Sequence, residues 1–228
     1  MNVAIIVAAG KGTRMGTDKL WLEVQGIPIV GHTWRTFDRS EVIDQVILVV
    51  REERQQEFRD LGQQIQVRKP FHFAPGGQER QDSVWNGLQG CPEDCEMVAI
   101  QDAARPCTHP SHIRDCLDAA REHGAVVAAQ KVTDTLKRVD GSLTIESTVD
   151  REGLWSVQTP QVFRFEVIRE AMQSVRDQGL VVTDDTAACE SIGYSVKVVP
   201  GDHPNPKVTF PGDLPYISWL LANLSDDV

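Results

Sequence analysis

Residues 7–19 read Val-Ala-Ala-Gly-Lys-Gly-Thr-Arg-Met-Gly-Thr-Asp-Lys, and this stretch indicates both fold and chemistry. It follows an apolar run, residues 3–7, whose length and β-branched side chains are typical of a buried strand. The turn that comes next contains three glycines, Gly10, Gly12 and Gly16. Glycine lets the backbone approach a ligand closely, and the consecutive free N–H groups of such a turn bind anions.

The same turn carries three positively charged side chains, Lys11, Arg14 and Lys19. Arg can hold two phosphate oxygens with its planar fork, while Lys acts as a point charge. A strand that leads into a glycine turn with these cations therefore predicts a polyphosphate site and chemistry at the phosphate. A solvated surface cluster is the usual alternative for such residues, and the glycine turn disfavours it.

The composition is that of an ordinary globular protein, with 228 residues, of which 41% are hydrophobic and 25% charged. This length favours one large core, so we expect a single domain over residues 1–228. No apolar run approaches the ~20 residues of a membrane helix. The strand pattern begins at the N-terminus, so we expect no targeting peptide and a cytoplasmic location. The net charge of 23 − 33 = −10 argues against a nucleic-acid partner but not against a small phosphorylated ligand.

Five cysteines, an odd number without a secretory context, indicate reduced thiols. Four Cys and His residues lie close enough in sequence to suggest a zinc site: Cys107, His109, His112 and Cys116. However, Pro110 interrupts this run and we expect the next helix to begin near Ser111, so the four side chains would not converge easily. Short Cys/His matches also have a high false-positive rate, and the sequence favours the absence of zinc.

Strand-like and helical patterns alternate along the chain. Strand-like runs recur at residues 46–50, 97–101, 125–130 and 195–199. Helical patterns include the face formed by Val30, Trp34 and Phe37, and residues 83–88, 113–121 and 165–178. This alternation predicts an α/β fold, a three-layer α/β/α sandwich with a mostly parallel, Rossmann-like sheet.

One segment interrupts the alternation. Residues 135–147 alternate apolar and polar side chains around Asp140-Gly141, which is a strong hairpin signal, and residues 154–158 form a further extended piece. An isolated hairpin is marginally stable in water, so it should pack on another element or another subunit. We expect a β-arm at about residues 134–160 that serves in dimerisation.

Ligands of an open α/β sheet bind beyond the carboxyl ends of its strands. Four clusters fall at such ends: the glycine turn and residues 76–84, 101–106 and 206–209. Asp102 suits a magnesium ligand, because Mg²⁺ prefers one or two carboxylates together with phosphate oxygens. A helix cap or an ion pair with Arg105 is the alternative, and the counter-ion that phosphates need favours Mg²⁺.

In this order the clusters resemble the 2-C-methyl-D-erythritol 4-phosphate cytidylyltransferase family of non-mevalonate isoprenoid biosynthesis. The glycine motif alone would indicate only a sugar-type nucleotidyltransferase, whereas the ordered set is far more specific. The resemblance covers nearly the whole chain and rests on Ala-Ala-Gly-x-Gly-x-Arg-Met (8–15), Gly-Gly-x-x-Arg-x-x-Ser-Val (76–84), Asp-Ala-Ala-Arg-Pro (102–106), Asp-Thr-Leu-Lys (134–137), Gln-Thr-Pro-Gln-x-Phe (158–163), Thr-Asp-Asp (183–185) and Lys-Val-Thr (207–209).

The resemblance implies that CTP and 2-C-methyl-D-erythritol 4-phosphate react to give the CDP-alcohol and pyrophosphate, with Mg²⁺ as cofactor. The acceptor phosphate would attack the α-phosphorus in line, so catalysis is positioning and charge neutralisation. No general base is required, because a phosphate monoester is an anion near neutral pH.

The resemblance also implies residue roles. Arg14 and Lys19 match transition-state stabilisers, and Arg151 and Lys207 match residues that orient the attacking phosphate. The implied nucleotide site comprises Ala8, Ala9, Gly10, Lys11, Gly12, Gly77, Ser83, Asp102 and Ala103. The implied acceptor site comprises Arg105, Thr135, Arg151, Thr159, Thr183 and Lys207. In the family the hairpin arm reaches across a homodimer, so Thr135 and Arg151 would act in the partner's active site.

Two positions depart from the family pattern. The segment before Lys19 is shorter than usual, and Asp18 stands where the family usually has proline, so Lys11 is an alternative to Lys19. Gln101 stands where the family often has histidine.

Three other functions are weighed against this one. A cytidylyltransferase for another polyol phosphate, such as ribitol 5-phosphate, would share the phosphate machinery and differ in the acceptor pocket. An NAD(P)-dependent oxidoreductase would need an acidic residue about 20 positions after its glycines, and here the second strand ends nearly 40 residues after Gly12 and is followed by Arg51. A non-catalytic nucleotide-binding module is disfavoured by the clustered cations.

Overall fold

A computed structural model describes residues 1–10 and 18–223 of the chain. The predicted Lys11, Gly12 and Arg14 therefore lie outside the described residues. The main sheet of the described residues has seven strands in the order β11-β7-β10-β6-β1-β4-β5. The strands are β1 (Asn2–Val7), β4 (Gln45–Val50), β5 (Phe71–Pro75), β6 (Met97–Asp102), β7 (Ala125–Lys131), β10 (Trp155–Arg164) and β11 (Lys197–Pro200). β10 runs antiparallel to β6 and β7, and the remaining pairs are parallel.

The central strands β1, β4 and β6 are mostly apolar because both faces of the sheet are covered. In β1, Ala4 and Ile6 pack into one hydrophobic core, while Val3 and Ile5 pack into the other. The predicted mostly parallel, three-layer sandwich is confirmed. Sequence reasoning missed β5, whose aromatic residues are only partly buried.

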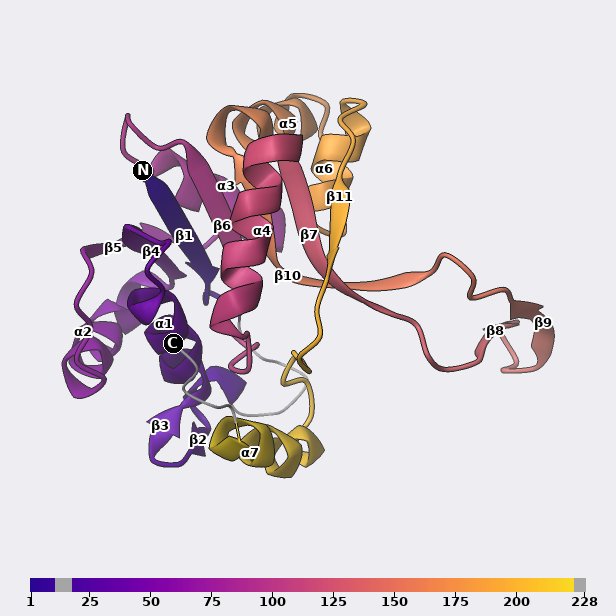
Figure 1. The fold of residues 1–228 in the computed structure, drawn as a ribbon, viewed down its shortest axis with the longest axis horizontal. Coiled ribbons are helices and arrows are strands. Elements are labelled where there is room, and N and C mark those ends of the chain that lie inside the picture. The colour runs from indigo at the N-terminus through magenta and orange to yellow at the C-terminus, as the bar shows by residue number, and fades with distance from the viewer. Residues whose placement is uncertain (11–17, 224–228) are drawn as a thin grey trace.

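Helices cover the two faces of the sheet (Figure 1). One core contains side chains of α1 (Ile29–Arg39), α2 (Gln55–Gln64), α4 (Pro110–His123) and α7 (Leu214–Asn223). The other contains side chains of α3 (Arg80–Gln89), α5 (Phe165–Asp177) and α6 (Asp185–Ser191). Short elements complete the fold: η2 (Lys19–Trp21), β2 (Glu23–Val24), β3 (Ile27–Pro28), η3 (Glu52–Arg54) and η4 (Pro211–Asp213).

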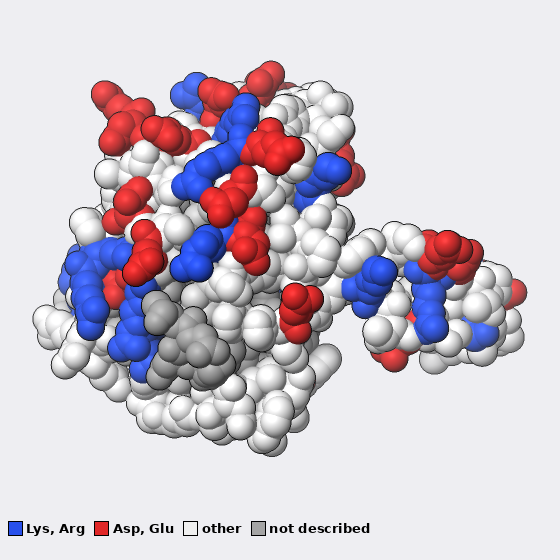
Figure 2. All heavy atoms as spheres, in the orientation of Figure 1, with Lys and Arg blue, Asp and Glu red and all other residues white. Residues whose placement is uncertain are grey.

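The predicted hairpin is present as β8 (Leu136–Val139) and β9 (Ile145–Val149), which form a separate two-stranded sheet. Figure 1 shows it projecting away from the main sheet, and Figure 2 shows positive and negative side chains next to one another on it. Its apolar residues are unusually exposed, with Leu143 at 82% and Ile145 at 61%. The hairpin therefore leaves an apolar surface uncovered within its own chain.

The segment with the zinc-like spacing has other contacts. Pro110 is the first residue of α4, one residue before the start predicted near Ser111, and it separates Cys107 and His109 from the helical His112 and Cys116. Proline suits the first helical turn, where its missing N–H costs nothing. The His109 ring stacks on His203, and the His112 ring lies 3.2 Å from the Val199 carbonyl oxygen. Among residues 1–10 and 18–223, no group of three or more His, Cys, Asp or Glu side chains is arranged to hold a metal ion. None of the described helices is long and apolar enough to span a bilayer.

Candidate active site

The carboxyl ends of β1 and β6 meet at one edge of the sheet. Ala8 and Ala9 leave β1 as buried residues, and the Ala8 amide donates a hydrogen bond of 2.8 Å to Val49. The Ala103 amide donates to the Val7 carbonyl at 3.3 Å, so the loop after β6 is fixed to the end of β1. The structure thus places three predicted nucleotide-binding residues side by side, with Gly10 exposed next to them.

The turn after β5 packs on the same edge. A Cβ atom added to Gly76 would lie 2.3 Å from the Cβ of Ala9, so only glycine permits this approach of the two turns. The Gly77 amide donates to Ser83 Oγ at 3.0 Å, which joins the turn to the first turns of α3. The predicted Gly77 and Ser83 therefore lie in one structural unit with Ala8 and Ala9.

Asp102, the last residue of β6, is the negative charge at this edge. Its Oδ2 accepts a hydrogen bond of 2.8 Å from Lys207 Nζ, and its Oδ1 lies 3.3 Å from Arg80 Nε. Arg105 Nε lies 3.6 Å from Oδ2. Burial would by itself raise the pKa of Asp102, but the charges of Arg80 and Lys207, the Lys207 hydrogen bond and Arg105 outweigh burial and lower this pKa to about 2. The carboxylate is therefore ionised at neutral pH.

Arg80 and Asp185 form a second ion pair that sequence reasoning did not identify. The Arg80 guanidinium donates to both oxygens of Asp185 at 2.9 and 2.8 Å, and the Asp185 side chain is only 1% exposed. Burial alone would lower the pKa of Arg80, but Asp185 and Asp102 hold it above its ordinary value. Both residues occur in the quoted motifs, at 76–84 and 183–185, which was the available signal. Because they lie 105 residues apart in the sequence, their pairing could not be predicted from local pattern.

Lys207 and Lys19 approach this edge from opposite ends of the chain. Lys19 Nζ donates to the Val208 carbonyl at 2.7 Å, and the Val208 amide donates to the Ala104 carbonyl at 2.8 Å. Asp18, the departure from the family pattern, caps η2 and pairs with the guanidinium groups of Arg51 at 3.2 Å and Arg54 at 3.1 Å. Asp18 thus anchors the segment that presents Lys19 beside the Lys207 loop.

Two further predicted acceptor residues lie beside Asp102. The Asp102 amide donates to Thr159 Oγ1 at 3.1 Å, and Arg105 Nη1 donates to the Asn205 carbonyl at 2.6 Å. Thr183 is exposed and precedes Asp184, which caps α6. The structure therefore brings Arg105, Thr159 and Lys207 together around one carboxylate.

Thr135 and Arg151 lie elsewhere in the chain. They flank β8 and β9 of the hairpin, and both are exposed. Arg151 Nη1 donates to the Thr133 carbonyl within the arm. The structure of one chain thus does not bring these two predicted residues to the edge that carries Asp102.

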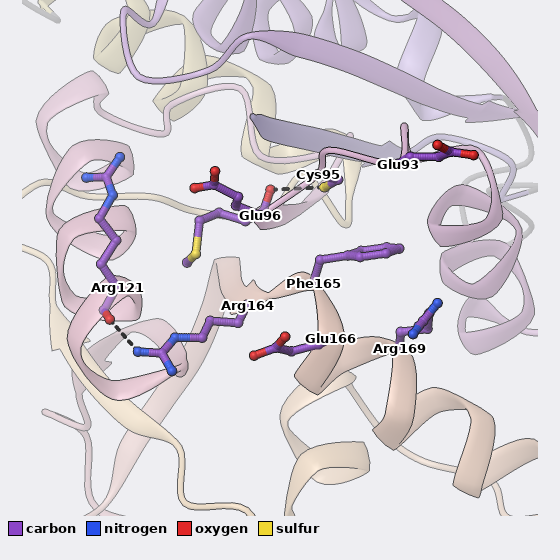
Figure 3. A pocket seen from close by; sticks show the side chains of 9 residues that line it. Glu93, Cys95, Glu96, Arg121, Arg164, Phe165, Glu166 and Arg169 are labelled. Carbon is purple, nitrogen blue, oxygen red and sulfur yellow. Dashed lines mark hydrogen bonds between the residues drawn. The ribbon is translucent and has the colours of Figure 1, made fainter.

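A separate cavity of about 530 Å³ lies at the opposite, amino edge of the sheet (Figure 3). It is lined by Met97, the first residue of β6, and by Arg164, the last residue of β10. Arg164 Nη2 donates to the Arg121 carbonyl at 2.7 Å, and glutamates contribute charge of the opposite sign to the lining. This cavity is therefore distinct from the cationic edge.

The chain matches, over residues 2–223, the family described as "IspD: 2-C-methyl-D-erythritol 4-phosphate cytidylyltransferase". The chain belongs to this family. Membership confirms the resemblance drawn from the ordered motifs. A relative from Geobacillus thermodenitrificans with the same name is 42% identical over 222 residues, covering 96% of each chain. A relative of that name from Bacillus cereus is 42% identical over 94% of this chain and 95% of its own.

Solved structures agree with this family membership. A crystal structure of the 4-diphosphocytidyl-2C-methyl-D-erythritol synthase from Anaerococcus prevotii matches with a TM-score of 0.85 and 28% identity, covering 97% of this chain and 98% of its own. The 2-C-methyl-D-erythritol 4-phosphate cytidylyltransferase from Thermus thermophilus matches with a TM-score of 0.79 and 28% identity, covering 97% and 100%. The α/β architecture of this chain is thus that of the family.

Loss of Arg80 should destabilise the fold more than loss of the whole ion pair. Arg80→Met leaves the Asp185 charge buried without its main partner, which costs about 3–5 kcal/mol. Adding Asp185→Asn removes that charge and should recover part of the loss. Urea unfolding at pH 7 gives the free energy of unfolding of the wild type, the single variant and the double variant. The control Arg121→Met removes an exposed pair with Asp118 and should cost less than about 1 kcal/mol. Equal stabilities of the single and double variants would contradict a buried, compensated charge.

Asp102 should make stability depend on pH below about 4. Because its pKa of about 2 in the folded state lies below the ordinary value, ionised Asp102 stabilises the fold above pH 4. This stabilisation is lost as the pH falls from about 4 towards 2. Between pH 5 and pH 2 the wild type should lose about 2 kcal/mol more unfolding free energy than Asp102→Asn. Denaturant titrations at each pH measure the difference, and parallel pH profiles would refute the assignment.

Proposed function

We propose that the carboxyl edge of this sheet transfers the cytidylyl group of CTP to 2-C-methyl-D-erythritol 4-phosphate. One observation carries the proposal: Lys207 and Asp102, 105 residues apart, meet at 2.8 Å at the carboxyl end of β6. Together with family membership, this supports a site in which cations and a carboxylate surround phosphate groups. The products are 4-diphosphocytidyl-2-C-methyl-D-erythritol and pyrophosphate.

The reaction requires the two phosphates to be positioned and requires no general base. An acceptor phosphate oxygen forms a bond to the α-phosphorus of CTP, while the bond from that phosphorus to the bridging oxygen breaks and pyrophosphate leaves with the electron pair. The attacking phosphate monoester is already an anion near neutral pH. The protein therefore contributes alignment of the two phosphates and neutralisation of the charge that they bring together.

The nucleotide half of the site is assigned to the turns after β1, β5 and β6. Backbone amides and the Ser83 hydroxyl would read the base, and Arg14 and Lys19 would stabilise charge in the transition state. The full nucleotide set is Ala8, Ala9, Gly10, Lys11, Gly12, Gly77, Ser83, Asp102 and Ala103. The close packing of Gly76 on Ala9 supports this assignment, because it holds two of the three turns in fixed relation.

The acceptor half is assigned to residues on the other side of Asp102. Lys207 and Arg151 would orient the attacking phosphate, and Lys207 has the exposure for this task, since 42% of its side chain is accessible. The remaining acceptor residues are Arg105, Thr135, Thr159 and Thr183. A lysine at the edge can exchange its carboxylate partner for an incoming phosphate.

Asp102 is proposed to hold Mg²⁺ when CTP is bound. The donor chemistry fits, because Mg²⁺ takes one or two carboxylates and fills its other positions with phosphate oxygens and water. Asp102 is ionised at neutral pH, as such a ligand must be. The bound ion would screen the negative charge of the triphosphate.

The enzyme is further proposed to act as a cytoplasmic homodimer through its arm. Exposed Leu143, in the turn of the hairpin, and exposed Ile145, in β9, belong to a two-stranded hairpin that is marginal in isolation, so a second chain would cover them. Thr135 and Arg151 would then complete the partner's acceptor site. This supports a shared site, since one chain keeps these residues on the projecting hairpin.

Purified protein with CTP and Mg²⁺ should release pyrophosphate rapidly with 2-C-methyl-D-erythritol 4-phosphate and at least about tenfold more slowly with ribitol 5-phosphate, because acceptor contacts set the rate difference. Chelation of Mg²⁺ should abolish release with either acceptor. Pyrophosphate release, measured for each acceptor separately, is the assay. A preference for ribitol 5-phosphate would overturn the acceptor assignment, and turnover in the chelator would overturn the role of the metal.

Two inactive variants should complement each other if the arm completes the partner's site. Arg14→Ala alone should lower kcat by about 10² to 10³, as expected when a transition-state contact is lost. In a heterodimer of Arg14→Ala and Arg151→Ala chains, one site carries both lesions and the other carries neither. Differently tagged chains, co-purified, should therefore regain about half of the wild-type activity.

The two homodimeric variants, purified in the same way, are the controls. Tandem-tag purification confirms that heterodimers are present. Heterodimers no more active than the homodimers would show that each chain uses its own Arg151, and would remove the arm from the partner's site.

A further inference from the structure

The loop between β11 and η4 contains a buried side-chain amide, that of Asn205, which has no role in the proposed reaction. Asn205 is only 2% exposed, although it lies in a segment without helix or strand, residues 201–210. A buried amide must find hydrogen-bond partners, because an unsatisfied polar group is costly away from water. The partners of Asn205 therefore indicate what this residue holds in place.

Asn205 joins three segments of the chain. Its Nδ2 donates to the Thr159 carbonyl in β10 at 2.7 Å. Its Oδ1 accepts from Thr108 Oγ1, in the loop after β6, at 3.1 Å. Its own carbonyl accepts from Arg105 Nη1 at 2.6 Å. Two of the three contacts are thus made with Arg105 and Thr159, both assigned to the acceptor half of the site.

The same residue fixes the start of the short segment that carries Lys207. Pro204 and Pro206 flank Asn205, and a residue that precedes proline is confined to extended conformations. Beyond Lys207, Val208 is fully buried and hydrogen-bonded to Ala104. Lys207 is therefore held between two anchors, and its ammonium group reaches Asp102 from there.

A second layer of contacts supports the Thr108 side of Asn205. Gln101 Nε2 donates to Thr108 Oγ1 at 2.9 Å, so the glutamine that departs from the family pattern acts towards Asn205 through Thr108. The outer part of the loop has its own attachment, because the His203 ring stacks on His109 at 3.8 Å. Loss of the Asn205 amide should consequently disturb the acceptor side without releasing the whole loop.

We propose that Asn205 is a positioning residue: it holds Arg105, Thr159 and Lys207 in fixed positions relative to one another, so that together they bind the acceptor phosphate. It acts through these three residues and not by touching the nucleotide. This inference rests on the acceptor roles proposed above. Its consequence is selective: the acceptor phosphate should lose binding and alignment when the amide is removed, while CTP should bind almost normally.

The test compares steady-state kinetics of the full-length protein with Asn205→Ala and Thr108→Val. Asn205→Ala removes both side-chain bonds, so KM for 2-C-methyl-D-erythritol 4-phosphate should rise about tenfold or more and kcat should fall, with KM for CTP changing less than about threefold. Thr108→Val removes the hydroxyl that donates to Oδ1 and accepts from Gln101 but leaves the Asn205–Thr159 bond in place, so it should shift the acceptor KM in the same direction by a smaller factor. Thr108→Val also tests the proposal if Asn205→Ala fails to fold.

Two controls separate the possible failures. Asn2→Ala removes a 2.8 Å bond from an asparagine amide to the Val42 carbonyl at the amino edge of the sheet, and it should leave both KM values unchanged. Lys207→Ala tests the acceptor assignment itself, and it should raise the acceptor KM. If Lys207→Ala has no such effect, the proposed site fails together with this inference.

If Lys207→Ala raises the acceptor KM and Asn205→Ala does not, the inference alone fails. Equal rises in the KM for CTP and for the acceptor in Asn205→Ala would also overturn it, because a general loss of structure would act on both substrates. A thermal unfolding curve of each variant confirms that folded protein is being compared. A selective rise in the acceptor KM, graded from Thr108→Val to Asn205→Ala, supports the positioning role.

Discussion

Asp102 carries a full negative charge at the end of β6, in a place where burial alone would favour its neutral form. Arg80, Arg105 and Lys207 reverse that preference, and each comes from a different part of the chain. The carboxylate in turn allows three cations to gather without repelling one another into solvent. Strand order places these groups at one edge of the sheet, and this local charge balance keeps them together.

The three cations around Asp102 are not equivalent. Arg80 is fixed by both oxygens of Asp185, a side chain almost without exposure, so it serves the scaffold. Arg105 is fixed by the Asn205 carbonyl. Among the described residues, the Lys207 ammonium group is bound by the Asp102 carboxylate, and Lys207 is the most exposed of the three cations. A site of this kind can offer one mobile charge to a phosphate while the other two preserve the geometry around it.

Sequence reasoning recovered what depends on local pattern. The apolar runs of β1, β4, β6 and β7 and the Asp140-Gly141 hairpin follow from side-chain period and turn chemistry, and the motifs located the residues near Asp102. It did not recover the Arg80–Asp185 pair or the contacts of Asn205, because hydrogen bonds between residues 46 to 105 positions apart leave no periodic trace in the sequence. Nor did it find β5 or α7: β5 is partly exposed, and α7 is apolar over most of its surface, with exposed Trp219 and Tyr216.

Site residues at strand ends could be predicted from the sequence, whereas contacts made within an irregular loop could not. The proposed nucleotide half is assigned to turns that begin directly after strands, and the strand ends from which they start are fixed by the hydrogen-bond ladders of the sheet. The proposed acceptor half includes residues 201–210, which form no strand, so its geometry depends on separate contacts such as the Val208–Ala104 backbone bond and the side-chain bonds of Asn205 and Asp102. Such contacts can change one at a time without altering the sheet. A fold with one common nucleotide edge can therefore accommodate different acceptors, because the acceptor side is determined by individual polar contacts.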